Sequence, residues 1–277
     1  MEKPLYRWTV GGCLQQGLDI LAESIEITTK TLGIDTFDWM ICYNGLTSDN
    51  IEFLKKAIGD KPVELVAQDW KNCAIPDTCK SPRRSDGSYE WDGRRCGGTL
   101  WKVSPARMRL NSHEIVADND VIILKQIPAI EEFFNSKDKV LILEEPIRFY
   151  GRYEKYFEDR KPPYLNSGFM GFCPGFDFGK AIRTVWESHK EFNTEAQEET
   201  PLFNLTQADE QGLLMLTLKQ YPNLRINKSF VKEILAQDRN AVVDGTEYAI
   251  HFTQGNRLPR HLGWIQYNAI KENHMMF

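Results

Sequence analysis

The sequence has 277 residues, of which 42% are hydrophobic and 26% are charged, and its formal net charge is −5. This balance is typical of a globular protein and excludes wholesale disorder, and the negative charge argues against a general nucleic-acid binder, which usually carries a basic face. No run approaches the roughly 20 apolar residues that span a bilayer, and residues 1–7 lack the apolar core of a signal peptide. We therefore expect a cytoplasmic protein with no nucleic-acid partner and no transmembrane segment.

The first part of the chain alternates expected strands and helices. Strands are expected at 6–10, 39–43 and 63–67, and helices at 15–31 and 48–58. Strands separated by helices of this length indicate βαβ units and a largely parallel sheet. Ligands bind beyond the carboxyl ends of the strands in such sheets, and Gly11, Gly12 and Asn44 lie at these ends. Ser48 is expected to cap the second helix.

Residues 70–100 differ in composition, because Cys, Pro, Gly and Arg are frequent there. A long insertion without secondary structure in a compact domain is usually functional or mobile. We interpret it as a loop at the rim of the active site, with a merely solvated basic loop as the alternative. Its cysteines, Cys73, Cys79 and Cys96, lack the paired spacing of a zinc site, so we expect free thiols.

The second part of the chain mixes expected helices and strands. A helix is expected over 99–110, and it would carry Lys102, Arg107 and Arg109. The other expected elements are strands at 140–143, 164–172 and 248–252, and helices at 178–188 and 208–220. Neither an internal repeat nor a linker is evident. We therefore expect a single α/β domain with a mixed sheet over residues 1–277.

Two carboxylates interrupt an apolar, β-branched stretch between His113 and Leu124. Asp118 and Asp120 are two positions apart, so in extended chain they point the same way. Two close carboxylates beside a buried strand are costly unless a cation or hydrogen-bond donors neutralise them. A hard divalent cation, Mn²⁺ or Mg²⁺, would do so. The alternative is a polar turn between two strands, which Asp and Asn also favour.

Four motifs, each weak by itself, stand in a definite order along the chain. They are Asp118-Asn-Asp120, Leu165-Asn-Ser-Gly-Phe-Met170, Ala208-Asp-Glu-Gln211 and Ile250-His-Phe252. In this order, behind alternating strands and helices, they resemble the GT-A class of nucleotide-sugar glycosyltransferases, most closely the glycogenin and lipopolysaccharide galactosyltransferase-like family. The resemblance covers about residues 6–259. It implies the GT-A fold, a Rossmann-like α/β fold whose mixed, mostly parallel central sheet is flanked by helices.

The resemblance implies a metal-dependent enzyme that transfers a hexose from a nucleoside diphosphate sugar, with a UDP-sugar as the expected donor, to a hydroxyl of a glycan or glycolipid. Asp118, Asp120 and His251 would hold Mn²⁺ or Mg²⁺, which stabilises the charge on the departing nucleotide. A lone histidine at a strand end is otherwise a polar surface residue or a capped core residue. The residues expected to bind the donor are Thr9, Val10, Gly11, Gly12, Asn44, Lys102 and Asn119. For Lys102 the alternative is a solvated helix face.

The residues expected to act on the donor sugar are Asn166, Asp209, Glu210 and Gln211. The family has an adjacent Asp-Gln pair, whereas Glu210 here separates Asp209 from Gln211. Either Asp209 or Glu210 could therefore face the sugar, and Asp209 has the rival role of capping its helix. The family retains the anomeric configuration, so retention is expected. Glu144 or Glu145, at a strand end, keeps open an inverting mechanism with a general base.

A non-catalytic nucleotide-binding or glycan-binding module on the same fold is the second hypothesis, because fold alone does not establish activity. A nucleotidyltransferase is the third, since it also needs paired carboxylates and a metal. Intact metal ligands count against the second hypothesis, and the late His-Phe motif counts against the third. In the Asn-Ser-Gly motif, Gly168 is expected to allow a close approach of backbone or to mark a bulge.

Overall fold

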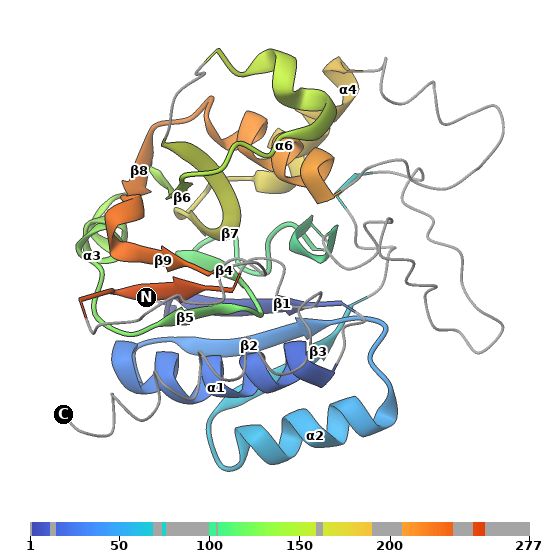
Figure 1. The fold of residues 1–277 in the computed structure, drawn as a ribbon, viewed down its shortest axis with the longest axis vertical. Coiled ribbons are helices and arrows are strands. Elements are labelled where there is room, and N and C mark those ends of the chain that lie inside the picture. Colours follow the sequence, from blue (N-terminus) through green and yellow to red (C-terminus); the bar gives the residue numbers. More distant parts are fainter. Residues whose placement is uncertain are drawn as a thin grey trace, which may run out of the picture.

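The computed structural model describes residues 2–11, 15–68, 74–75, 100–103, 105–158, 163–189, 207–234 and 246–252. Gly12 and nearly all of the expected rim loop at 70–100, with its three cysteines, lie outside these ranges. The described residues form two β-sheets with helices packed around them (Figure 1).

A seven-stranded sheet in the order β3-β2-β1-β4-β7-β6-β8 forms the centre of the fold. Its strands are β1 (Leu5–Val10), β2 (Asp38–Tyr43), β3 (Val63–Ala67), β4 (Glu114–Asp118), β6 (Val140–Glu145), β7 (Tyr164–Phe172) and β8 (Asn223–Ile226). Strand β7 is antiparallel to both of its neighbours, and every other pair is parallel. The carboxyl ends of β1, β2, β4 and β6 therefore lie along one edge. This mixed, mostly parallel sheet confirms the expected fold class.

Helices cover both faces of this sheet. They are α1 (Gln15–Leu32), α2 (Ser48–Ile58), α3 (Pro128–Asn135), α4 (Phe178–Ser188) and α6 (Gln207–Leu218), with short 3-10 helices η3 (Leu100–Val103), η4 (Gly151–Tyr156) and η5 (Lys228–Phe230). Alternate residues of a strand point to opposite faces. Accordingly Ile115 of β4 belongs to the core under α1 and α3, whereas Val116 belongs to the core under α4 and α6.

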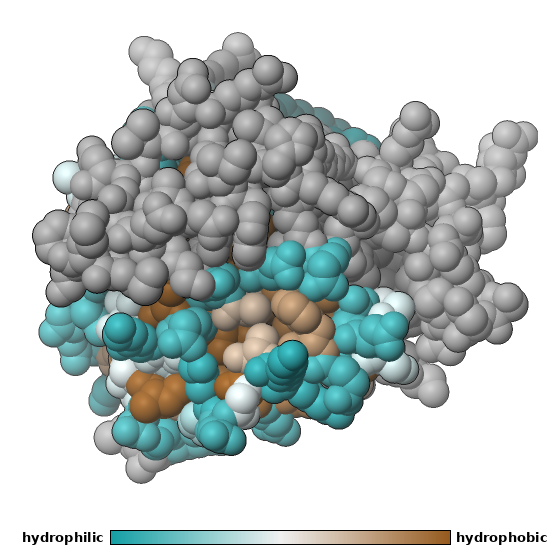
Figure 2. All heavy atoms as spheres, turned by 60° about the horizontal axis from the view of Figure 1, so that its bottom comes forward, coloured by the Kyte–Doolittle hydropathy of each residue, from teal (hydrophilic) through white to brown (hydrophobic). Residues whose placement is uncertain are grey.

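Helices α1 and α2 form the lower layer in Figure 1. Figure 2 turns this layer forward and shows apolar side chains gathered in the middle of a mostly hydrophilic outline. The other sides of the two helices pack on β1 and β2, where Trp8 and Trp39 stack with ring centroids 5.5 Å apart. Among the described residues, no helix is both long and apolar enough to cross a membrane.

A second sheet of three strands joins parts of the chain that are distant in sequence. Its order is β5 (Val121–Ile123), β10 (Ala249–His251) and β9 (Val231–Glu233). Strand β10 runs antiparallel to β5, which pairs His251 with Val121. This register brings the expected histidine ligand beside the carboxylates that immediately precede β5.

The expected helix over 99–110 is wrong, because only η3 is helical among the described residues there. The fully buried carboxylate of Glu114 accepts the backbone N–H groups of Met108 and Arg109 at 2.9 and 3.0 Å. The same carboxylate lies 2.9 Å from the guanidinium of Arg7, which is also fully buried. Arg107 donates to the carbonyl groups of Cys173 and Phe176 at 3.1 and 2.9 Å. Residues 107–109 therefore make these bonds to Glu114, Cys173 and Phe176, and the segment is irregular and not helical.

Smaller differences from the expected elements occur at helix α2 and in the later part of the chain. Thr47 caps α2 instead of Ser48, because its side chain accepts from the backbone of Asn50 and the Asn50 side chain accepts in return. Helix α3 was not expected from the sequence, although Pro128 stands at its first turn and Ile130 is buried. Strands β8 and β9 were also not expected, and each has only three or four residues.

Candidate active site

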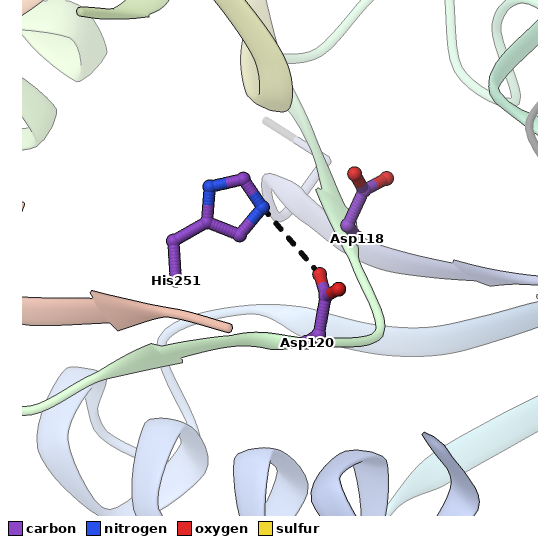
Figure 3. Close-up of side chains that lie close together, drawn as sticks. All are labelled: Asp118, Asp120 and His251. Atoms are coloured by element: carbon purple, nitrogen blue, oxygen red, sulfur yellow. Dashed lines mark ion pairs between the residues drawn. The ribbon is translucent and has the colours of Figure 1, made fainter. Parts of the chain in front are cut away.

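Three side chains from three segments converge at the carboxyl end of β4 (Figure 3). Asp118 ends β4, Asp120 precedes β5, and His251 ends β10. One ligand atom from each residue lies within 4.8 Å of the other two. Nε2 of His251 is 3.6 Å from Oδ1 of Asp120. The turn between β4 and β5 and the pairing of β5 with β10 therefore bring the three expected metal ligands together.

The chemistry of this group fits a hard divalent cation. Burial lowers the pKa of His251 to about 4, so its imidazole is neutral at pH 7 and can present a nitrogen lone pair. Burial, together with the charge of Asp118, raises the pKa of Asp120 to about 8. Oδ1 of Asp120 is buried without a hydrogen-bond donor among the described residues. Two carboxyl side chains and a neutral imidazole, with an unpartnered oxygen of Asp120 among them, match the ligand preferences of Mn²⁺.

Gly168 provides the room that His251 occupies. A Cβ atom at this position would lie 2.7 Å from Cε1 and 3.0 Å from Nε2 of the imidazole. The register of β7 against β6 shifts between Ile142 and Leu143, which is the sign of a bulge. Gly168 therefore lies in an irregular stretch of strand, as in the alternative interpretation, and the close approach that it allows is that of the His251 imidazole and not of backbone.

Lys102 is a buried cation next to these ligands, and it does not lie on a solvated helix face. Its ammonium group lies 2.9 Å from Oδ1 and 3.0 Å from Oδ2 of Asp118, and it donates to Oγ of Ser167 at 3.0 Å. Oε1 of Glu210 lies 3.6 Å away. Burial by itself would lower the pKa of Lys102, but the charges of Asp118, Glu210 and Asp120 raise it above the ordinary value. Lys102 is therefore a permanent positive charge.

Three consecutive side chains near the start of α6 have different partners. Asp209 accepts the backbone N–H of Arg152 in η4 at 2.6 Å, and its other oxygen lies 3.3 Å from Nε of Arg152. Glu210 instead faces Lys102, and burial raises its pKa to about 7. Gln211 donates from Nε2 to Oε1 of Glu145 at 2.7 Å. Of the two residues expected to face the sugar, Glu210 is the one that lies near the metal-ligand group.

The two carboxylates at the end of β6 have different partners, and Asn166 binds one of them. Asn166 donates from Nδ2 to Oε2 of Glu145 and accepts the backbone N–H of Gly168, both at 2.5 Å. Burial raises the pKa of Glu145 to about 8. Glu144 has a different partner, because its carboxylate lies 3.6 Å from the guanidinium of Arg225 on β8.

The residues expected to bind the nucleoside lie at the carboxyl ends of β1 and β2. Thr9 is paired with Asp118 across the β1–β4 ladder, and Val10 and Gly11 are buried. Asn44 donates from its amide to the carbonyl of Gln68. The Asn119 amide points to α1, where it donates to the carbonyl of Gly17 at 3.1 Å. Asn119 therefore anchors the turn that carries the two aspartates.

Sequence reasoning gave no role to Ser167 or Arg152. Ser167 lies inside the Asn-Ser-Gly motif, so its position next to Asn166 was a usable signal. Arg152 had no such signal, because its contact with Asp209 depends on how η4 packs on α6.

The seven-stranded mixed sheet, with two aspartates and a histidine at its carboxyl edge, has the GT-A fold of nucleotide-sugar glycosyltransferases. Solved structures with a similar fold include the galactosyltransferase LgtC in complex with donor and acceptor sugar analogues. It matches with a TM-score of 0.50 and 10% identity over 90% of this chain and 86% of that chain. The expected resemblance to this class is thereby confirmed at the level of the fold.

Two further matches are larger proteins than this chain. The glycosyltransferase GlyE of Streptococcus pneumoniae TIGR4 matches with a TM-score of 0.50 and 8% identity over 99% of this chain and 65% of that chain. The bifunctional glycosyltransferase WbbM matches with a TM-score of 0.51 and 11% identity over 91% of this chain and 45% of that chain. No family model matches the sequence, and no curated protein matches it either.

Proposed function

We propose that this protein is a metal-dependent glycosyltransferase that transfers a hexose from a nucleoside diphosphate sugar to a hydroxyl of a glycan or lipid-linked acceptor. The observation that carries the proposal is the convergence of Asp118, Asp120 and His251 at the carboxyl edge of a GT-A sheet. These residues would hold Mn²⁺ or Mg²⁺, which when bound acts as a Lewis acid on the diphosphate leaving group. A UDP-sugar is the proposed donor.

The proposed donor lies across the ends of neighbouring strands. Thr9, Val10, Gly11, Gly12 and Asn44 would contact its base and ribose, because ligands of such sheets bind beyond the carboxyl ends of the strands. The pairing of Thr9 with Asp118 supports this placement, since one donor can then reach from the end of β1 to the proposed metal ligand at the end of β4. Lys102 would add a fixed positive charge beside the diphosphate or the sugar.

We assign the proposed sugar contacts to Glu210 and Gln211, with Asn166 as a support for their surroundings. Glu210 is favoured over Asp209 because Glu210 faces Lys102 and Asp209 binds η4. Retention of configuration is the proposed outcome. The competing inverting mechanism needs a carboxylate with an oxygen available to the acceptor. Both oxygens of Glu145 accept hydrogen bonds from side-chain amides, so Glu144, which lies 3.6 Å from the guanidinium of Arg225, is the remaining candidate base for that mechanism.

A donor screen tests the proposal. The protein is incubated with UDP-, GDP- and dTDP-sugars and Mn²⁺, and the release of nucleoside diphosphate is measured with and without a chelator. We expect turnover with one nucleotide, which Asp120→Asn abolishes and the surface variant Asp138→Asn preserves. Binding of a nucleotide without turnover would indicate a non-catalytic module instead. If the protein neither binds nor turns over a donor with any of the three nucleotides, the proposed transferase activity is refuted.

A further inference from the structure

Glu145 links two side-chain amides into a hydrogen-bond chain between β6, β7 and α6. The backbone N–H of Gly168 donates to Oδ1 of Asn166 at 2.5 Å, and Nδ2 of Asn166 donates to Oε2 of Glu145 at 2.5 Å. Nε2 of Gln211 donates to Oε1 of the same carboxyl group at 2.7 Å. All three side chains are buried, with 4% of Glu145, 3% of Asn166 and 7% of Gln211 exposed.

The orientation of the first amide in this chain is fixed by the backbone. A backbone N–H can only donate, so Asn166 must turn its oxygen to Gly168 and its nitrogen to Glu145. Oε2 of Glu145 is therefore an acceptor whatever the protonation state of the carboxyl group. Only Oε1 has a choice: ionised, it accepts from Nε2 of Gln211, and protonated, it donates to Oε1 of Gln211, whose amide must then be reversed.

We infer that Glu145 is a positioning residue that determines which end of the Gln211 amide faces the donor sugar. The inference rests on the proposed transfer reaction. The oxygen and nitrogen of an amide diverge from its trigonal carbon, so when Nε2 of Gln211 donates to ionised Glu145 the Gln211 oxygen is turned away from that carboxylate. Positive charge develops on the sugar during transfer, and a fixed carbonyl oxygen stabilises that charge, whereas a reversed amide presents its N–H groups.

The surroundings of Glu145 set its pKa in a range where turnover can be measured on both sides of it. Burial is the largest effect and raises the pKa of Glu145 to about 8, and Glu233 on β9 adds to it. The bonds from Asn166 and Gln211 and the charge of Lys102 act in the opposite direction. Tyr150 also faces this carboxylate and has its own pKa raised to about 12, chiefly by burial. Arg225, on the neighbouring strand, is paired with Glu144.

The protonation of Glu145 determines whether turnover rises or falls with pH. Below a pH of about 8 the protonated carboxyl group and the reversed amide accumulate, and above it the ionised carboxylate holds the carbonyl oxygen of Gln211 towards the sugar. We therefore expect kcat to rise with pH and to level off above this value.

The substitution Glu145→Gln fixes the reversed state. The new amide must turn its oxygen to Nδ2 of Asn166, so its own nitrogen faces Gln211 and donates to Oε1 of that side chain at every pH. We expect kcat to fall by about 100-fold, as for the loss of one transition-state contact, and the part of its rise with pH near 8 to disappear, while the titration of Glu210 near pH 7 remains. The Kd of UDP with Mn²⁺ should stay within about twofold, because the contacts to base and diphosphate are intact. Thermal stability should not fall, because no hydrogen bond is lost.

Two further variants distinguish positioning from general-base catalysis. Glu132→Gln makes the same change in a surface carboxylate of α3, whose partner is Lys139, and it should leave kcat and its pH profile unchanged. Gln211→Met removes the amide while keeping its approximate length. Adding Glu145→Gln to Gln211→Met should then cause no further loss, whereas a general base would cost its full factor in either background.

A measurement without turnover completes the test. The side-chain amide signals of Gln211 in ¹⁵N-labelled protein are assigned by their loss in Gln211→Met. They should shift with pH around 8 in the wild-type protein and stay constant in Glu145→Gln. If the wild-type protein turns over a donor but Glu145→Gln has the same kcat and pH profile, the inference is overturned and the proposed function stands. If no donor is turned over, the proposed function fails, and the amide signals still decide whether Glu145 orients Gln211.

Discussion

Gly168→Ala tests the metal-ligand group through the space that His251 occupies. The new Cβ atom would lie 2.7 Å from Cε1 of His251 and 2.8 Å from Oδ1 of Asn166. The first approach is about 0.7 Å shorter than the onset of ordinary contact at 3.4 Å, so repulsion must displace one of the two groups. Asn166 is held by the backbone N–H of the same glycine. The imidazole is therefore the group that moves.

A ligand shifted by this much should bind the metal less well. We expect Mn²⁺ affinity in the presence of UDP to fall by roughly 10- to 100-fold, the usual effect of losing a group that orients a metal ligand. The overpacking should also lower the free energy of unfolding by about 1–3 kcal/mol. Titration calorimetry measures the first effect, and denaturant unfolding measures the second.

Gly59→Ala is the matched control. Gly59 has a φ of 57°, and a Cβ atom added there would meet nothing within 4 Å, so alanine strains the backbone without touching the site. We expect it to cost about 1–3 kcal/mol of stability, as for a residue held in a sparsely populated backbone region, and to leave Mn²⁺ affinity unchanged. A folded Gly168→Ala protein that binds Mn²⁺ as tightly as the wild type would refute a ligand role for His251 in this position.

Three further predictions concern the metal, the sugar and the nucleotide. Chelation should abolish transfer and added Mn²⁺ should restore it, as followed by nucleotide release; activity that persists in chelator would rule out metal dependence. Glu210→Gln should lower turnover by about 100-fold with little change in nucleotide affinity. Asp209→Asn should mainly lower the Tm, through its bonds to Arg152, and the reverse pattern would show that Asp209 faces the sugar. UDP with Mn²⁺ at 100 times its Kd should stabilise the fold by about 2.7 kcal/mol, and the absence of any Tm shift with UDP, GDP or dTDP would count against a nucleotide site.

The sequence by itself determined most of the regular elements, because their patterns are local. The bounds of β3, β7 and α4 agree with expectation to the residue, and those of β1, β2 and α1 to within one residue. The helices α1 and α4 have an apolar period of helical spacing and the strands are short runs rich in apolar residues, and neither pattern depends on distant contacts. The helix expected at 99–110 failed for the opposite reason. Its backbone bonds go to Glu114, a residue whose buried partner, Arg7, lies on another strand.

At the site, the sequence determined that Asp118 and Asp120 would lie close together, because they are only two positions apart. The structure places Asn119 and Asp120 in a turn between β4 and β5, as in the alternative interpretation, and not in extended chain. Only the tertiary structure brought His251 to them, through the pairing of β10 with β5. It also decided between Asp209 and Glu210. Neighbouring residues of a helix point about 100° apart, so which one faces the site depends on how α6 is rotated against η4 and the sheet. That rotation is set by packing with distant segments, and no local pattern in the sequence encodes it.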